Sequence, residues 1–477
     1  MKLHHIAAAV AVLSLASVSA QATLVSATPA HNTIVADAKA NNRVISISGA
    51  SAVRAGFYEL VKKMFVGTPI AFSSGANLSQ DYIAAAGVLA SGSGAWSGKN
   101  VIVVYRVKGG SVFGVDPVAR ATSIPALDVN TSCGAAGGSG SDTSPYQCGT
   151  TLMVPDAGVS DVAPALFASP TNTEGETAAP QLSAAELASL TITPLYSLAF
   201  GIPVTSNVPD TAKLNRATVS AIMTGNISDW SQVKDAGSGD IVICRRTPGS
   251  GSQAVMNLWA GNYPCNTDAQ QFPADRDASG AWDASAKKFT AANGAGGLIV
   301  IENSSSSQVA SCLTAAVNGG VYGTFDRDGV AVSVDFGAGG YKAIGVLSMD
   351  SLASSTAASK WQFRSLDGAG KVVAAAVAGA APTLTGTGRF PTLASLMTGD
   401  WDLQGWVSFN VPSRTVGAKA DALAKFANAA QDPAVIGSVA ALKQVAAAIP
   451  GGAYSGAQVL NVGYQFNNQC APLNRNF

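Results

Sequence analysis

Charged residues are scarce in this chain of 477 residues. Lys, Arg, Asp and Glu make up 12% of it, about half of the ~25% found in an average protein. The 29 basic residues balance the 29 acidic ones, so the formal net charge is zero. A neutral chain gives no indication of binding to nucleic acids or to membrane surfaces. Any site for a charged ligand must therefore be local.

Histidine is scarcer still, because only His31 follows the first five residues. The sequence also has no Cys-x-x-Cys motif. Zinc sites are built from His and Cys, and a Ser-His-Asp triad needs a histidine as its base. These absences argue against both sites. We expect no metal, no cofactor and no enzymatic activity.

The one long apolar stretch lies at the N-terminus. A basic start, "MKLHH", precedes "IAAAVAVLSLASVSA", and small residues at 18–20 and 20–22 offer cleavage sites. This pattern is typical of a secretory signal peptide over residues 1–22. No cysteine follows that could carry a lipid, and no later apolar run is long enough to span a bilayer. We expect a periplasmic or secreted protein with no membrane anchor.

Six cysteines remain after the signal peptide. An even number in an exported chain predicts three disulfides and no free thiol. The pairs closest in sequence are Cys133–Cys148 and Cys244–Cys265, which leaves Cys312–Cys470. Since six cysteines allow fifteen pairings, these three bonds are hypotheses.

Strand and helix patterns alternate along the chain, which predicts an α/β fold. A β run at 44–47 leads through a glycine turn to a helix with Val53, Phe57, Leu60 and Met64 on one face, and Ser51 lies where an N-cap would lie. Residues 73–75 precede what we expect to be another helix. Strands are also expected at 100–107, 192–208, 240–246 and 341–348, and helices at 183–190, 214–225, 304–317 and 420–430.

The stretch "CRRTPGSGSQAVMNLW", residues 244–259, combines two arginines with a glycine-rich turn and the start of a helix. The first turn of a helix exposes backbone N–H groups with partial positive charge, and glycine lets a ligand approach them. Ser250 and Ser252 add hydroxyl donors, and an arginine adds a planar fork suited to an oxyanion. This stretch predicts an anion pocket. The alternative is a capped surface helix with an ordinary arginine pair.

Six segments, in this order, resemble the periplasmic phosphate-binding proteins of ABC importers, which have the two-lobed type II solute-binding fold. They are "SGASA" at 48–52, "SSGA" at 73–76, "GVSDVAP" at 158–164, "LNRATVSAIMTGNISDW" at 214–230, "RRTPGSGS" at 245–252 and "AIGVLSM" at 343–349. The resemblance covers neither 88–150 nor the last few dozen residues.

The resemblance implies a cleft between two lobes. Lobe 1 would be residues 23–197, with an elaborated insertion at about 88–150, together with 393–477; lobe 2 would be 198–392. The chain would cross near Leu198 and Leu393, and these crossings would act as a hinge. The implied ligand contacts are Ser51, Ser73, Asp161, Arg246, Ser250, Gly251 and Ser252. We expect both Arg245 and Arg54 to be solvated neighbours of the site, with the mouth of the cleft as the alternative place for Arg54.

The function implied is capture of an inorganic oxyanion, first of all phosphate, by a monomer that serves an ABC permease outside the cytoplasm. Arg246 would supply positive charge, and an ionised Asp161 would accept a hydrogen bond from a protonated phosphate oxygen that sulfate lacks. The alternative roles are N-capping for Ser51 and Ser73, a surface or capping role for Asp161, and a structural ion pair for Arg246.

Two rival functions stay open. One is a phosphatase on the same scaffold, which the lack of histidine disfavours because metal-assisted hydrolysis relies on His and Asp clusters. The other is a secreted structural or adhesive protein that keeps the fold with weak or no phosphate binding. The departures from the family pattern favour this second rival, because Val53 and Pro248 replace a hydroxyl and an acidic residue.

Overall fold

The computed structural model describes residues 25–26, 29–135, 138–169, 181–266, 272–273, 275, 280–292, 297–450 and 458–476. The predicted signal peptide and its cleavage sites lie outside these residues. Within the described ranges, none of the helices is both long enough and apolar enough to cross a bilayer.

The first lobe is built on one end of the largest sheet. Its strand order there is β23-β10-β2-β5-β4-β3-β8. β2 is parallel to β10 and β5, and the remaining pairs are antiparallel except β3 with β8. The strands are β2 Val44–Gly49, β3 Ile70–Ser73, β4 Tyr82–Val88, β5 Asn100–Arg106, β8 Tyr146–Gln147, β10 Ala157–Ser160 and β23 Gln404–Pro412.

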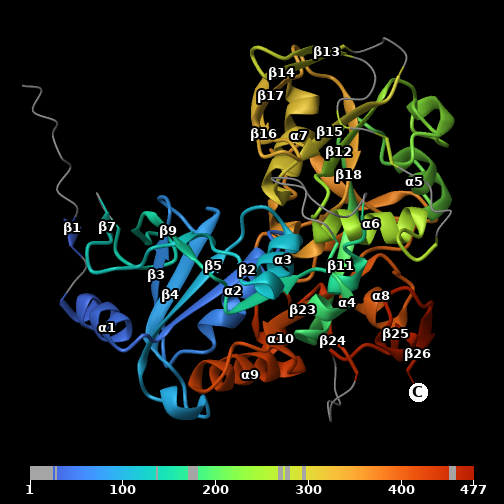
Figure 1. Cartoon of the computed structure of the whole chain (residues 1–477). Helices are drawn as coiled ribbons and strands as arrows, with labels where there is room; N and C mark the ends of the chain where they lie inside the picture. Colours follow the sequence, from blue (N-terminus) through green and yellow to red (C-terminus); the bar gives the residue numbers. More distant parts are fainter. Residues whose placement is uncertain are drawn as a thin grey trace, which may run out of the picture.

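Helices pack around this end of the sheet (Figure 1). α2, Arg54–Lys62, and α9, Ala418–Ala430, lie together near β23, and α1, Pro29–Ala40, packs against β4 and β5. Phe57 of α2 packs against Tyr105, Phe409 and Phe426, which come from β5, β23 and α9. This aromatic group joins the N-terminal and C-terminal parts of the chain in one core.

One long strand, β11, joins the two lobes. It spans Leu190–Thr205. Its first part pairs with β23 and β24, Ala446–Ala448, and its last residues pair with strands of the second lobe. The boundary predicted near Leu198 therefore falls within a continuous strand, and the domain limits remain a prediction.

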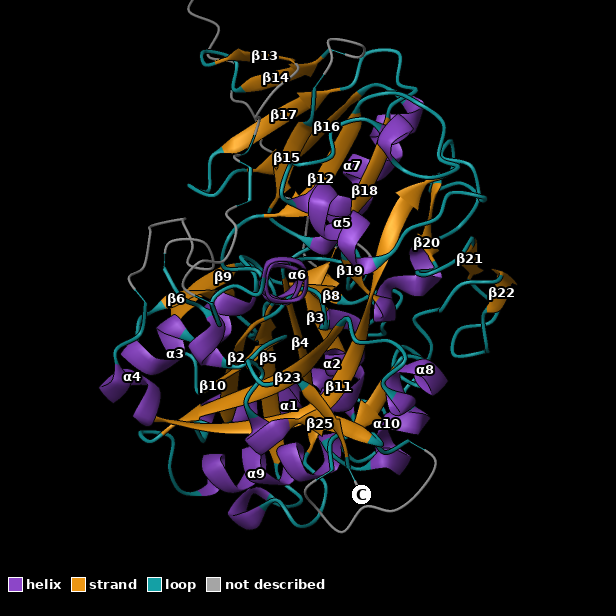
Figure 2. Ribbon diagram, turned by 90° about the vertical axis from the view of Figure 1, so that its right-hand side faces the viewer, coloured by secondary structure: helices purple, strands orange, loops and turns teal. Residues whose placement is uncertain are grey.

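The second lobe continues the sheet in the order β15-β12-β18-β11 and carries α7 against it (Figure 1). β12 is parallel to both β15 and β18. The elements are β12 Ile241–Arg246, β15 Ile299–Asn303, β18 Lys342–Gly345, β19 Leu347–Ser348, β20 Trp361–Arg364, β21 Gly370–Val373, β22 Thr383–Gly386, α5 Arg216–Met223, α6 Gly251–Gly261 and α7 Ser306–Asn318. Figure 2 shows α6 end-on, between the two lobes.

Smaller elements complete the fold. A separate sheet has the order β13-β14-β17-β16, with bounds Gly280–Asp283, Lys288–Ala291, Ala331–Asp335 and Val321–Phe325. The others are β1 Val25–Ser26, β6 Ile124–Leu127, β7 Gly134–Ala135, β9 Thr150–Met153, β25 Val462–Tyr464, β26 Leu473–Arg475, α3 Asp116–Arg120, α4 Ala184–Ala188, α8 Leu393–Thr398 and α10 Pro433–Ser438.

The α/β prediction is confirmed, and so are most of the expected elements. β2 and β12 are apolar runs buried nearly throughout, as expected for parallel strands that are covered on both faces. α4 begins at the predicted capping box of Ser183 and Glu186. α2, however, has Val53 as its N-cap residue, with no side-chain cap, so Ser51 is not the N-cap.

The helix expected after Ser73–Gly75 is wrong. Residues Tyr82–Val88, "YIAAAGV", form strand β4 between β3 and β5. Ala84, Ala85 and Ala86 are fully buried in the sheet. Alanine has a high intrinsic helix propensity, but pairing with strands on both sides overrides that preference here.

All six cysteines are paired, as predicted. Of the three predicted disulfides, however, only Cys133–Cys148 is correct. The bonds are Cys133–Cys148, Cys244–Cys312 and Cys265–Cys470, with Cα–Cα distances of 4.8, 5.9 and 5.4 Å. Cys244 lies on β12 and Cys312 on α7, which packs against that strand. The 11 residues of α6 separate Cys244 from Cys265 by roughly 16 Å of helix, so closeness in sequence was misleading.

Candidate anion-binding site

The start of α6 forms one wall of the site. Gly249, with φ of 77°, turns the chain in the left-handed region that glycine tolerates, and Ser250 caps the helix by accepting from the Gln253 backbone N–H at 3.4 Å. The predicted residues Ser250, Gly251 and Ser252 are all buried at this turn. The helix therefore presents its first backbone N–H groups to the interior of the molecule, between the lobes.

Arg246 ends β12 and is 1% exposed. Its Nε donates to the Asn303 carbonyl oxygen at 3.0 Å and its Nη2 to the Ser304 carbonyl oxygen at 2.7 Å. Its Nη1 donates to Ser51 Oγ at 3.1 Å and to Ser306 Oγ at 3.4 Å. These contacts fix the guanidinium between the loop before α2 and the start of α7.

Asp161 follows β10 and faces the start of α6. Its Oδ2 accepts from Ser252 Oγ at 3.2 Å, and its backbone N–H donates to Ser111 Oγ at 3.3 Å. Its Oδ1 is buried and has no hydrogen-bond partner within the described ranges. Burial raises the pKa of Asp161 to about 6, while the charge of Arg246 and hydrogen bonds from Ser252 and Ser111 oppose that rise.

Gly251 lies where the two lobes approach most closely. A Cβ on this residue would lie 2.4 Å from Ser111 Oγ and 2.6 Å from Asp161 Cβ. Only glycine allows this approach, because real Cβ contacts essentially never fall below 3.0 Å. The glycine predicted as a ligand contact therefore also allows the carboxylate of Asp161 to reach the helix start.

Sequence analysis missed Ser111. This residue begins the 3-10 turn Ser111–Gly114, after β5 and within the 88–150 stretch that the family resemblance does not cover. Val112 N–H donates to the Gly249 carbonyl oxygen at 2.9 Å, so the turn packs directly against the anion loop. The "GGS" at 109–111 after an apolar strand is the same kind of signal as the glycine turn at 48–52.

Ser51 contacts the candidate site, because its hydroxyl accepts a hydrogen bond from Arg246. Ser73 makes no such contact within the described residues. The Ser73 hydroxyl donates to the Asn77 carbonyl oxygen at 2.7 Å and accepts from the Gly75 N–H at 3.3 Å. These bonds satisfy the hydroxyl within its own turn, and none of its hydrogen bonds reaches Asp161 or Arg246 in the part of the chain that the structure describes. The geometry thus brings together every predicted site residue except Ser73.

Arg245 is not the solvated neighbour that the sequence suggested. It is 6% exposed, and its Nη2 lies 2.9 Å from Glu302 Oε1. Arg327 also pairs with Glu302. A strand alternates its side chains between two faces, so Arg245 and Arg246 point in opposite directions. One arginine serves a structural ion pair and the other reaches the site.

The combined arrangement suits a tetrahedral anion that carries a proton. Arg246, the α6 N-terminus and several hydroxyls are donors, while Asp161 Oδ1 is an acceptor without a donor. Among the described residues, no group of three or more His, Cys, Asp or Glu side chains could hold a metal ion.

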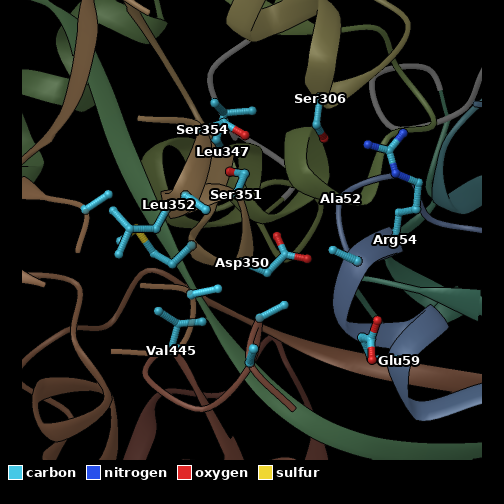
Figure 3. Close-up of a pocket in the computed structure, with 18 of the residues that line it drawn as sticks. Ala52, Arg54, Glu59, Ser306, Leu347, Asp350, Ser351, Leu352, Ser354 and Val445 are labelled. Carbon is cyan, nitrogen blue, oxygen red and sulfur yellow. The ribbon is translucent and has the colours of Figure 1, made fainter. Parts of the chain in front are cut away.

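A pocket of about 490 Å³ adjoins this group. It shares Ser51 and Ser306 with the surroundings of Arg246 and continues past Arg54 and Asp350. Figure 3 shows the carboxylate of Asp350 and the hydroxyl of Ser306 directed into this space. Arg54 also lines the pocket, and its Nη1 donates to the Ser79 carbonyl oxygen at 3.0 Å.

Residues 184–381 match the family model described as the PBP superfamily domain. This match agrees with the resemblance to periplasmic binding proteins that the sequence motifs gave, and the α/β fold is consistent with such a domain. Among curated proteins, none matches the chain.

The solved structures that resemble this one are phosphate-binding proteins. A Clostridium perfringens protein assigned as a phosphate ABC transporter substrate-binding protein, with bound phosphate, shares 11% identity over 83% of this chain and 98% of its own, with a TM-score of 0.39. An ABC-type phosphate transport receptor from Vibrio cholerae shares 12% identity over 81% and 93%, with a TM-score of 0.33. A phosphate-binding protein from Stenotrophomonas maltophilia shares 15% over 81% and 84%, with a TM-score of 0.38.

Proposed function

We propose that this protein captures a tetrahedral oxyanion, phosphate above all, outside the cytoplasm and serves an ABC permease as a monomeric binding protein without enzymatic activity. The observation that carries the proposal is the buried Oδ1 of Asp161, which lies near Arg246 and the start of α6 and has no hydrogen-bond partner among the described residues. A buried acceptor left unsatisfied costs about 1–3 kcal/mol, and more when it is charged. A ligand that brings a donor to this position removes that cost.

Phosphate is the anion that meets both requirements of the site. Its unprotonated oxygens accept from Arg246, from Ser252 and from the backbone N–H groups at the start of α6. Near neutral pH it keeps at least one proton, which it can donate to Asp161. Sulfate has no proton at this pH, so its oxygen would face the carboxylate lone pair against lone pair.

The ligand would bind between the lobes and hold them together. Among the contacts between residues predicted to lie in different lobes are Arg246 with Ser51 and Ser252 with Asp161. An anion bound between these residues would exchange some of these bonds for bonds to its own oxygens. Closure around a ligand is the usual response of two-lobed binding proteins.

Equilibrium dialysis with labelled phosphate tests the proposal. At pH 7 and fixed salt, we expect saturable binding of one phosphate per chain, which excess sulfate displaces poorly. No retention of phosphate would instead support the secreted structural or adhesive protein. Release of phosphate from an ester, dependent on a divalent metal, would support the phosphatase.

A further inference from the structure

The pocket beside the anion site is larger than an inorganic ion requires. It measures about 490 Å³, within the range of about 300–1,000 Å³ that holds organic ligands, whereas phosphate has five heavy atoms. The pocket begins at Ser51 and Ser306, whose hydroxyls both lie within hydrogen-bond distance of Arg246 Nη1. A substituent on a bound phosphoryl group would therefore enter this pocket directly.

Asp350 supplies a second unsatisfied acceptor inside the pocket. Its Oδ1 accepts from Ser348 Oγ at 2.7 Å, but its Oδ2 is buried and has no hydrogen-bond partner in the part of the chain that the structure describes. Figure 3 shows the carboxylate directed into the space that Ala52, Arg54 and Ser306 border. A buried carboxylate oxygen in this position calls for a donor from a ligand.

The charges around Asp350 favour an added cation or hydroxyl. Burial raises the pKa of Asp350 to about 7, and the nearby negative charge of Asp161 contributes to the rise. Ser348, Arg54 and the Gly56 backbone N–H oppose it. Arg54 forms no salt bridge with Asp350 in the described structure, since its Nη1 donates to the Ser79 carbonyl oxygen.

Beyond Asp350 much of the pocket wall is apolar. Leu347, Met349, Leu352, Trp361 and Val445 line it, together with the polar residues Ser351, Ser354 and Gln444. Carbon atoms of an organic substituent would gain about 25 cal/mol for each Å² of apolar surface removed from water. The order of groups along the pocket is therefore anion site, carboxylate and apolar wall.

We infer that the preferred ligand is an organic phosphate whose substituent carries an ammonium or hydroxyl donor. The phosphoryl group would occupy the Arg246–Asp161 site, the donor would meet Asp350, and the carbon atoms would lie along the apolar wall. This inference rests on the proposed function, because it requires a phosphoryl group in the anion site.

Calorimetric titration at pH 6.5 with three probes tests the inference. A phosphate monoester has a second pKa near 6, so about a quarter of it then still carries a proton. Asp161 and Asp350, whose pKa values are raised to about 6 and about 7, are both partly ionised at this pH, and an ammonium group beside Asp350 would favour its ionised form. The probes are inorganic phosphate, ethyl phosphate and phosphoethanolamine, and the two esters differ in the ammonium group. We expect phosphoethanolamine to bind at least tenfold more tightly than ethyl phosphate, and Asp350→Asn to remove most of that difference.

Asp350 faces the first turn of α2 through Gly56, so its substitution could also disturb folding. Ala310→Phe, on α7, provides an independent test because Ala310 lines the pocket. We expect it to lower the affinity for phosphoethanolamine relative to inorganic phosphate at least tenfold. Ala315→Phe is the matched control, since Ala315 is a partly buried alanine of the same helix that does not line this pocket; it should leave the ratio unchanged.

The outcomes separate this inference from the proposed function. Binding of inorganic phosphate with no preference for phosphoethanolamine over ethyl phosphate would overturn the inference alone. A preference that persists in Asp350→Asn would also overturn it and assign Asp350 to capping α2. If none of the three probes binds, the proposed function fails together with the inference.

Discussion

At the scale of single residues, the proposed function makes Asp161 the group that selects the anion. Its Oδ2 accepts from Ser252 Oγ, and its buried Oδ1 has no hydrogen-bond donor among the described residues. Ser111 fixes the backbone of Asp161 from the other side. The carboxylate is thus held in place before a ligand arrives, which limits the side-chain entropy lost on binding.

Substitution of Asp161 by Asn keeps the shape of the side chain but can turn an N–H donor toward the ligand. We expect Asp161→Asn to narrow the preference for phosphate over sulfate at least tenfold, mainly because sulfate binds more tightly. Competition binding of both anions at pH 7 and fixed salt measures this preference. Asp128→Asn, in an ion pair with Lys39, is a control. A mutant that keeps the wild-type preference would show that Asp161 is not the selectivity group.

The selectivity should also depend on pH. Burial raises the pKa of Asp161 to about 6, so the acceptor form dominates above that pH and the protonated form below it. A protonated Asp161 can donate to sulfate. We therefore expect the preference for phosphate to be full near pH 7.5 and to decline as the pH falls through 6 toward 5. A preference that stays constant over this range, measured by the same competition assay, would rule out titration of Asp161.

At the scale of elements, the start of α6 depends on the absence of a side chain at Gly251. Gly251→Ala would place a methyl group 2.4 Å from Ser111 Oγ. We expect it to destabilise the protein by about 1–3 kcal/mol through overpacking and to weaken phosphate binding at least tenfold. Chemical denaturation and calorimetry measure the two effects.

Gly323→Ala, on β16, is the matched control, because an added Cβ there would meet nothing within 4 Å. Equal effects of the two substitutions would argue against a special role for the α6 start.

The sequence predicted elements well where one local signal was strong. The apolar runs of β2 and β12 and the capping box of α4 are local features, and the structure has all three. The sequence-based prediction was wrong for β4, because this alanine-rich segment is extended only through its pairing with the neighbouring strands. For the candidate site, Arg246, Gly251 and Asp161 lie in short motifs, and the structure brings these three residues together.

What the sequence could not supply were contacts between distant segments. Ser111 reaches Asp161 across 50 positions, and no motif marks the pair. Arg245 and Arg246 look alike in sequence, and only Glu302, 57 positions from Arg245, separates their roles. The disulfide partners of Cys244 and Cys265 likewise depend on how α6 and α7 pack.

At the scale of the whole molecule, one disulfide ties lobe 2 to the C-terminal segment. Cys265–Cys470 joins residues 205 positions apart, whereas Cys133–Cys148 joins residues 15 apart. In the chain-entropy treatment, closing the longer loop adds about 5 kcal/mol to the free energy of unfolding, and closing the shorter loop adds about 3 kcal/mol. We expect Cys265→Ser with Cys470→Ser to destabilise the protein more than Cys133→Ser with Cys148→Ser. Urea denaturation of both double variants gives the comparison, and the reverse order would contradict this account.

Arg246 is buried and donates to Ser51 across the predicted lobe boundary, and the central claim is that this arginine holds the anion. Loss of its charge would leave a bound anion without its main partner, at a cost of roughly 2–5 kcal/mol. Arg246→Lys should recover only part of the loss, because lysine lacks the planar fork. Arg389→Ala, at an exposed ion pair with Asp367, should leave binding unchanged.

The most direct test is calorimetric titration of phosphate into the wild type and Arg246→Ala, at pH 7 and fixed salt, after circular dichroism has shown that both are folded. We predict a saturable heat of binding for the wild type and an affinity at least thirtyfold lower for Arg246→Ala. An unchanged affinity in Arg246→Ala would contradict the assignment of the anion site.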